Sequence, residues 1–208
     1  MNIIEALLPL NPYSRPGTAV KGPEKIVVHY VGNPGSTARN NRDYFANLAK
    51  THYAHVSSHY VVGLEGEIIR CIPEEEVAYG ASNKNQNTLH IECCHPDKTG
   101  KFTPATQEAL VELLADICRR KGLDPLADVV RHYDLTGKHC PLWYVNNPGE
   151  WADLKERVQR VLNPPEDRPE ILYRVQVGAF RVEENARRYA RELVSKGYPA
   201  FVTESEVE

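Results

Sequence analysis

The chain has 208 residues, of which 41% are hydrophobic, enough for one substantial folded domain and a small second one. Its formal net charge is −3, and acidic and basic side chains are mixed along the sequence without a basic block of the kind that binds nucleic acid or an anionic membrane. No stretch approaches the ~20 apolar residues that a membrane span requires. The composition therefore argues against a nucleic-acid partner and against membrane insertion.

The N-terminal segment, residues 1–17, begins with apolar side chains but lacks a basic region and contains Glu5, so it does not resemble an export signal. We expect a short helix there and a protein that is synthesised in the cytoplasm without a signal peptide. If the substrate lies outside the cell, another factor must release the protein.

Two predicted strands in the first half carry polar side chains near their carboxyl ends. Residues 25–30 form a β-branched run that stops at a Gly-Asn-Pro-Gly loop, so His29 is expected near the end of a buried strand. Residues 88–93 alternate as a second strand, with His90 and Glu92 on the face opposite the apolar side chains. The elements predicted between them are a helix and the two strands of a hairpin, at 38–50, 59–62 and 67–72.

The second half continues the alternation of helices and strands. A strongly amphipathic helix is predicted over 103–121, with Gly122 closing it. Residues 128–133 indicate a strand that ends at His132, and a last helix is predicted over 148–162. This order predicts an α/β fold in which a central mixed β-sheet is flanked by helices.

Residues 163–170 contain three prolines and three acidic residues, a composition typical of a stiff, solvated linker. We therefore place the end of the first domain, residues 1–162, at this segment. The remaining residues, 171–208, are expected to form a small βαβ piece with elements at 171–177, 182–196 and 200–202. We do not expect so short a piece to bury a core of its own.

Three residues of the first domain have the chemistry of a metal site. His132 at a strand end and Cys140, eight residues later in a polar loop, can reach one ion, because Zn²⁺ accepts imidazole nitrogen and thiolate sulfur. His29, at the end of a similar strand, is the natural third ligand. Two histidines and one cysteine leave a fourth position for water, which is the arrangement of a catalytic site. A strand-end histidine more often forms hydrogen bonds, so spacing alone leaves both interpretations open.

Four motifs in the same order resemble the type-2 N-acetylmuramoyl-L-alanine amidase family, which includes peptidoglycan recognition proteins and phage endolysins. They are KIVVHY at 25–30, SSHYVV at 57–62, NTLHIEC at 87–93 and RHYDLTGKHCP at 131–141. The resemblance covers residues 26–162. It implies cleavage of the amide bond between N-acetylmuramic acid and L-alanine in bacterial peptidoglycan, with Zn²⁺ held by His29, His132 and Cys140.

The resemblance also implies roles for residues around the metal. Glu92 corresponds to the general base for the zinc-bound water, and Lys138 to a cation that stabilises charge on the reacting carbonyl. These roles suit amide hydrolysis, since the nitrogen needs a proton to depart and one oxyanion donor is typically worth about 3 kcal/mol. Tyr60 occupies a position where other branches keep a catalytic or substrate-contacting tyrosine. Each residue also has a structural alternative: a solvated carboxylate, a loop cation or a packed ring.

Three further residues are candidates for substrate binding. Asn33 and Asn87 lie in loops beside the strands that carry the ligands, where turn formation is an equally good explanation. His90 shares a strand face with Glu92, and His59 is a similar case. Both histidines either line the cleft or form hydrogen bonds behind the metal ligands.

The C-terminal piece resembles the first half of a SPOR repeat, a fold associated with glycan strands stripped of peptides. Half a sheet leaves an open edge that can pair with a second copy, so a homodimer through this piece is one expectation. The resemblance implies an endolysin or a prophage-derived autolysin of a Gram-positive host, which reaches the cell wall through a holin-type opening or lysis. Two alternatives remain: a non-catalytic peptidoglycan-binding module, and a metal-independent hydrolase that uses Cys140 and His132.

Overall fold

A computed structural model describes residues 2–164 and 176–204 of the chain. The chain divides into two compact units, residues 1–165 and 166–208, which are described separately here. Most of the linker predicted at 163–170 lies outside the described residues. Among the described residues, no helix is long and apolar enough to cross a membrane.

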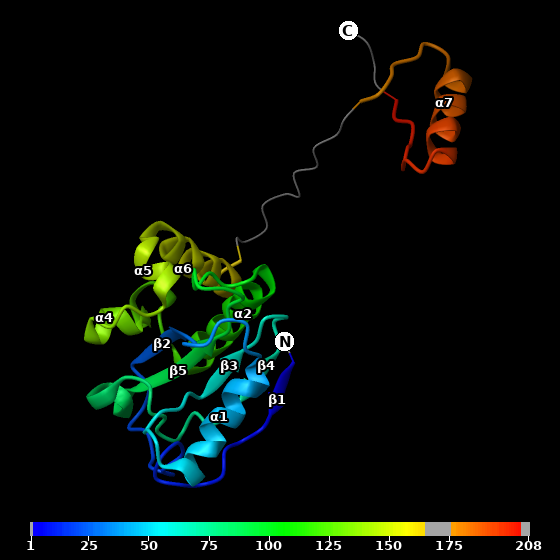
Figure 1. Ribbon diagram of the computed structural model, residues 1–208. Coiled ribbons are helices and arrows are strands. Elements are labelled where there is room, and N and C mark those ends of the chain that lie inside the picture. Colours follow the sequence, from blue (N-terminus) through cyan, green and yellow to red (C-terminus); the bar gives the residue numbers. More distant parts are fainter. Residues whose placement is uncertain (1, 165–175, 205–208) are drawn as a thin grey trace. The chain divides into compact units, whose positions relative to one another are not determined.

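The first unit is built on a six-stranded mixed sheet with the order β1-β4-β3-β5-β2-β6 (Figure 1). β3 and β4 form an antiparallel hairpin, whereas the other neighbouring pairs are parallel. The strands are β1 (Ile3–Glu5), β2 (Lys25–Tyr30), β3 (Tyr60–Val62), β4 (Ile68–Arg70), β5 (Thr88–Cys93) and β6 (Val129–Arg131). The predicted mixed sheet is confirmed.

The N-terminal residues do not form the helix expected for them. Residues Ile3–Glu5 instead pair in parallel with β4, as the edge strand β1. A short apolar stretch has no period that distinguishes helix from strand, and here the free edge of β4 decides the outcome.

The helices agree closely with the predicted ranges, because their ends carry local signals. The main helices are α1 (Ala38–Thr51), α2 (Pro104–Lys121) and α6 (Pro148–Leu162). Thr37 caps α1 by accepting the backbone N–H of Asn40 at 3.1 Å, and Gly122 ends α2 at a φ of 68°. The short helices are η1 (Ser82–Asn87), α3 (Pro125–Asp128), α4 (His132–Thr136) and α5 (Leu142–Asn146).

The two faces of the sheet are covered unequally. On one face, alternate residues of β2, β3 and β5 pack with α2 and α6 in the larger hydrophobic cluster. On the other face, α1 packs against β3 and β4 (Figure 1). His29 of β2 and Glu92 of β5 also lie on this second face, opposite the larger cluster.

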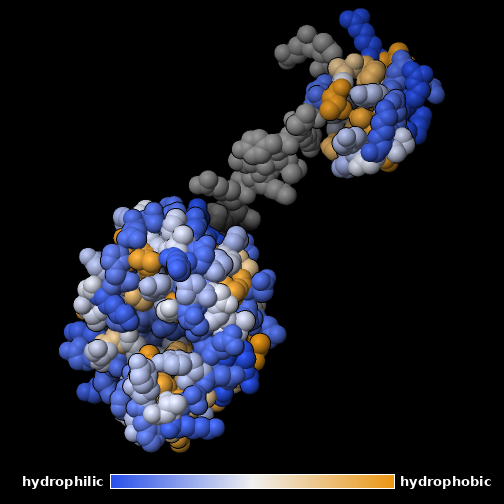
Figure 2. Space-filling view, in the orientation of Figure 1, coloured by the Kyte–Doolittle hydropathy of each residue, from blue (hydrophilic) through white to orange (hydrophobic). Residues whose placement is uncertain are grey.

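The described part of the second unit contains one helix, α7 (Glu183–Ser195), as predicted. Residues 200–202, expected to be a strand, have no strand partner in the described residues, and the strand predicted at 171–177 lies mostly outside them. A strand forms its backbone hydrogen bonds with a neighbouring strand, whereas a helix forms them within itself. The helix is therefore the part of this prediction that depends on local sequence alone. Apolar side chains remain exposed on this unit among polar ones (Figure 2), including Val177, Phe180, Val182, Val194 and Tyr198.

Candidate metal centre and active site

Two neighbouring parallel strands, β2 and β6, bring two of the predicted metal ligands to the same end of the sheet. His29 is the next-to-last residue of β2, and His132 begins α4 directly after β6. Cys140 lies in the segment between α4 and α5. Because β5, β2 and β6 run parallel, their carboxyl ends meet at the same edge, which is where ligands bind in sheets of this kind.

The three side chains converge in space. One ligand atom from each of His29, His132 and Cys140 lies within 4.8 Å of the others. Nδ1 of His29 is 3.8 Å from Sγ of Cys140, and the rings of the two histidines meet edge to face with their centroids 4.6 Å apart. All three residues are buried. The structure thus brings together the three residues that the sequence singled out.

The chemistry of this group fits a zinc ion. Nδ1 of His132 is buried and has no hydrogen-bond partner among the described residues, which a bound metal or its water would explain. Burial lowers the pKa of His132 to about 4 and that of His29 well below its usual value, with the charge of Lys138 adding to both effects. Both rings are therefore neutral at pH 7, the form that binds metal. Two imidazoles and one thiol are a donor set that Zn²⁺ prefers.

Local contacts fold the segment between His132 and Cys140 back on itself. The Arg131 guanidinium pairs with Asp134 at 2.6 Å, and the Tyr133 N–H donates to the carbonyl of Cys140 at 2.9 Å. Gly137 ends α4 at a φ of 76°, a conformation that favours glycine. The reversal explains how residues separated along the chain present their side chains to one point.

Glu92 lies directly beside His29. The two residues are register partners in the parallel pair β2–β5, so their side chains lie on the same face of the sheet. Oε2 of Glu92 is buried without a hydrogen-bond partner among the described residues, and burial raises the pKa of its carboxyl to about 8 although Lys138 opposes the rise. A carboxyl with a pKa near neutrality can both accept and donate a proton at pH 7.

Lys138 is exposed on the loop before Cys140. Its positive charge lowers the pKa of His29, His132, Glu92 and Cys140. A cation at this position can oppose negative charge that develops on a reacting carbonyl.

The three predicted substrate-binding residues lie in different surroundings. Asn33 is exposed in the loop after β2, where its carbonyl accepts the hydroxyl of Ser36 at 2.7 Å in a turn. Asn87 precedes β5, at the amino end, and five residues of strand separate it from Glu92 by roughly 16 Å. His90 is fully buried, with both ring nitrogens engaged, so it supports His29 and does not face a substrate.

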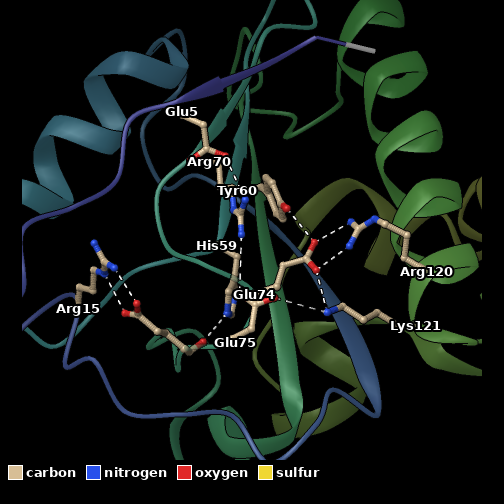
Figure 3. Close-up of polar contacts among 10 residues, drawn as sticks. Glu5, Arg15, His59, Tyr60, Arg70, Glu74, Glu75, Arg120 and Lys121 are labelled. Atoms are coloured by element: carbon tan, nitrogen blue, oxygen red, sulfur yellow. Dashed lines mark hydrogen bonds and ion pairs between the residues drawn. The ribbon is translucent and has the colours of Figure 1, made fainter.

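Tyr60 is not brought to this group either. In β3 it is the register partner of Ile91, and its ring belongs to the hydrophobic cluster on the α2 side of the sheet, opposite His29 and Glu92. Its hydroxyl donates to the buried carboxylate of Glu74 at 2.8 Å, which also accepts hydrogen bonds from Arg120 (Figure 3). Tyr60 therefore has the role of a packed, hydrogen-bonded ring.

Two further residues contact the His90 ring and were not among the candidates from the sequence. The Thr88 hydroxyl contacts Nε2 of His90 at 2.9 Å. Gly80 packs so closely on the same ring that an added Cβ would lie 2.4 Å from its Nδ1. Thr88 lies in a quoted motif and on the strand face of His90, but the sequence does not show that its hydroxyl contacts that ring. Gly80 belongs to none of the quoted motifs, and its contact depends on how the segment before β5 folds over the strand.

Comparison with known proteins identifies the family of the chain. Residues 19–143 match the N-acetylmuramoyl-L-alanine amidase family, Amidase_2, and residues 169–208 match the SPOR domain. The chain is 36% identical over 172 residues to the N-acetylmuramoyl-L-alanine amidase BlyA of Bacillus subtilis (strain 168), covering 73% of this chain and 45% of that protein. It is 34% identical over 175 residues to the N-acetylmuramoyl-L-alanine amidase CwlL of Bacillus licheniformis, covering 78% of this chain and 48% of that protein. The chain thus spans about half the length of these curated relatives.

Solved structures show the same fold. The catalytic domain of XlyA has a TM-score of 0.64 and 25% identity, covering 76% of this chain and 99% of that one. A mutant endolysin from Bacillus subtilis has a TM-score of 0.64 and 26% identity, covering 76% of this chain and 98% of that one. With a family match across more than half of its length, the chain belongs to the N-acetylmuramoyl-L-alanine amidase family and carries a C-terminal SPOR match.

Proposed function

We propose that this chain is a zinc-dependent amidase that hydrolyses the bond between N-acetylmuramic acid and L-alanine in bacterial peptidoglycan. The observation that carries the proposal is the convergence of His29, His132 and Cys140 at the carboxyl edge of the sheet, with Glu92 beside His29. The names of the curated relatives support the choice of bond.

Zinc held by His29, His132 and Cys140 would supply an activated water and polarise the scissile carbonyl. The protein's own groups then have separate tasks. Glu92 takes a proton from the attacking water and passes it to the departing nitrogen, a transfer that its raised pKa favours. Lys138 opposes the negative charge that develops on the carbonyl oxygen. The proposal gives no catalytic task to Tyr60, because its hydroxyl is bound to Glu74.

Digestion of purified cell walls tests the proposed bond. An amidase releases free L-alanine amino termini without new reducing sugars. New reducing ends would indicate a glycosidase instead, and new termini within the stem peptide would indicate a peptidase. Activity should disappear with a chelator and return with Zn²⁺, whereas full activity in the chelator would contradict metal dependence.

The two alternatives make different predictions. A non-catalytic binding module would bind walls without producing new ends. A metal-independent thiol hydrolase needs a cysteine with a lowered pKa, but burial, with a further contribution from Glu92, raises the pKa of the Cys140 thiol to about 12. The raised pKa of this thiol therefore favours metal-dependent hydrolysis over catalysis by a free thiolate.

We further propose that residues 171–208 direct the enzyme to glycan strands, as the SPOR match suggests. Deleting residues 166–208 should then reduce binding to purified walls while leaving turnover of a soluble muropeptide unchanged. Light scattering on the full chain tests the expected homodimer, which a purely monomeric mass would contradict. The likeness to an endolysin supports action on the wall after holin-type or lytic release.

A further inference from the structure

A chain of hydrogen bonds runs from the backbone before β5 to the proposed metal ligand on β2. The Thr88 hydroxyl lies 2.9 Å from the carbonyl oxygen of Lys84 and 2.9 Å from Nε2 of His90. Nδ1 of His90 lies 3.1 Å from Nε2 of His29, whose Nδ1 faces the Cys140 sulfur at 3.8 Å. Thr88, His90 and His29 are all buried.

The direction of this chain follows from counting protons. A carbonyl oxygen only accepts, so the single hydroxyl proton of Thr88 is donated to Lys84. The Thr88 oxygen then accepts from Nε2–H of His90. A neutral imidazole has one N–H, which leaves Nδ1 of His90 as an acceptor for Nε2–H of His29. Nδ1 of His29 is consequently the nitrogen with a free lone pair, on the side of Cys140.

The opposite direction would prevent metal binding through this atom. If Thr88 donated to His90, each following proton would move to the other ring nitrogen, and Nδ1 of His29 would carry a proton toward Cys140. The hydroxyl oxygen of Thr88 and the carbonyl oxygen of Lys84 would also face each other at 2.9 Å without a proton between them. Two such acceptors repel, so the Lys84 carbonyl selects the first direction.

We infer that Thr88 and His90 are positioning residues, which hold His29 in the tautomer protonated at Nε2 and so present Nδ1 to the metal. This inference rests on the proposed zinc site. The sequence alone left open whether His90 lines the substrate cleft or supports a metal ligand, and this inference assigns it to the second role. Partners of metal-bound histidines commonly fix the tautomer in this way, and their loss typically lowers metal affinity 10–100-fold.

Other contacts keep the His90 ring in place. The backbone N–H of His90 donates to Nδ1 of His59 at 2.9 Å, and Nε2 of His59 donates to the carbonyl of Glu76 at 2.9 Å. The His59 ring lies nearly parallel to the His90 ring, with centroids 5.9 Å apart, and the Gly80 backbone leaves no room for a Cβ beside the His90 ring. These contacts restrict the position of the His90 ring.

The first test uses the unmodified, metal-free protein. Two-bond ¹H–¹⁵N correlation spectra distinguish protonated from unprotonated imidazole nitrogens. We expect His29 and His90 to be protonated at Nε2 and unprotonated at Nδ1. Protonation of either residue at Nδ1 would overturn the inference without any mutation.

The second test compares three variants by Zn²⁺ affinity, measured by competition with a chromogenic chelator. Thr88→Val removes the hydroxyl at constant shape and should weaken Zn²⁺ binding at least about tenfold, while Thr88→Ser should keep it. The control is Thr106→Val, which removes an equally buried hydroxyl that donates to the Gly63 carbonyl on the other side of the sheet. It should lower stability without changing Zn²⁺ affinity.

The outcomes separate this inference from the proposed function. If the unmodified protein binds no Zn²⁺, the proposed metal site is wrong, and the spectra still report the tautomers. If it binds Zn²⁺ and folded Thr88→Val binds equally well, the positioning role is wrong and the metal site stands. Equal weakening by Thr88→Val and Thr106→Val would show a general loss of stability and would also contradict the inference.

Discussion

Replacing Glu74 by glutamine tests whether one buried carboxylate ties α2 to the sheet. Its side chain is only 3% exposed and accepts hydrogen bonds from Arg120 at 2.7 and 2.8 Å, from Tyr60 at 2.8 Å and from Lys121 at 3.0 Å (Figure 3). The glutamine keeps the shape but loses the charge and one acceptor. Its donors would then lack their anionic partner.

The magnitude follows from the carboxyl's pKa. Burial alone would raise the pKa of Glu74, but the hydrogen bonds from Arg120, Tyr60 and Lys121 lower it from 4.5 to about 2. This difference corresponds to about 3 kcal/mol of folding free energy. Because the pKa is lower in the folded state, the contribution is complete above pH 4.5 and is lost as the pH falls toward 2. The variant should therefore be about 3 kcal/mol less stable at pH 7 and nearly equal to the unmodified protein near pH 2.

Urea unfolding followed by tryptophan fluorescence measures this effect. Both tryptophans, Trp143 and Trp151, lie in the first unit, so the signal reports that unit alone. Glu75→Gln is the matched control, because the neighbouring carboxylate is 72% exposed and its ion pairs are 3.8 and 4.0 Å long. It should change the free energy of unfolding by less than about 0.5 kcal/mol. The reasoning would be refuted if the two variants changed the free energy of unfolding equally, or if Glu74→Gln remained less stable than the unmodified protein at low pH.

Four further variants address the site. Glu92→Gln should retain Zn²⁺ but lose at least about 100-fold in turnover of cell walls, and near-normal turnover would remove Glu92 as the proton carrier. Cys140→Ala should purify without Zn²⁺ by elemental analysis, since two ligands hold zinc poorly; full occupancy would contradict its assignment as a ligand. Tyr60→Phe should cost about 1 kcal/mol in urea unfolding with unchanged turnover, whereas a large loss of turnover in the folded variant would restore a catalytic role. Gly80→Ala should weaken Zn²⁺ binding because its Cβ meets the His90 ring, while Gly149→Ala, where a Cβ meets nothing, should not; equal affinities would show that the ring position is unimportant.

Much of the site could be found from the sequence because its parts are local. A β-branched run predicts the strand that carries His29, and alternation predicts that Glu92 lies opposite the apolar face of its strand. The order and spacing of the motifs then connect His132 and Cys140 with the same centre. The end of α2 at Gly122 was likewise predictable, since capping depends on neighbouring residues only.

Other features depended on contacts between distant segments. Alternation shows that Tyr60 lies opposite Val61, but only the pairing of β3 with β5 shows which of these faces carries the metal ligands. The edge of β4 makes residues Ile3–Glu5 a strand where a helix was expected. Asn87 precedes the strand predicted at 88–93. Only the parallel pairing of β5 with β2 shows that this amino end lies away from the end of β2 that carries His29.

By itself, the sequence determined the α/β class and three metal-ligand candidates, because strand period and motif spacing are encoded by neighbouring residues, and the family resemblance added Glu92 as a candidate general base. Only the tertiary structure decided what surrounds them. It buried His90 behind His29, set Thr88 and Gly80 against that ring, and bound the Tyr60 hydroxyl to Glu74. The physical reason is that burial and hydrogen-bond direction depend on which groups from distant parts of the chain pack together. The periodicity of neighbouring residues does not specify these contacts.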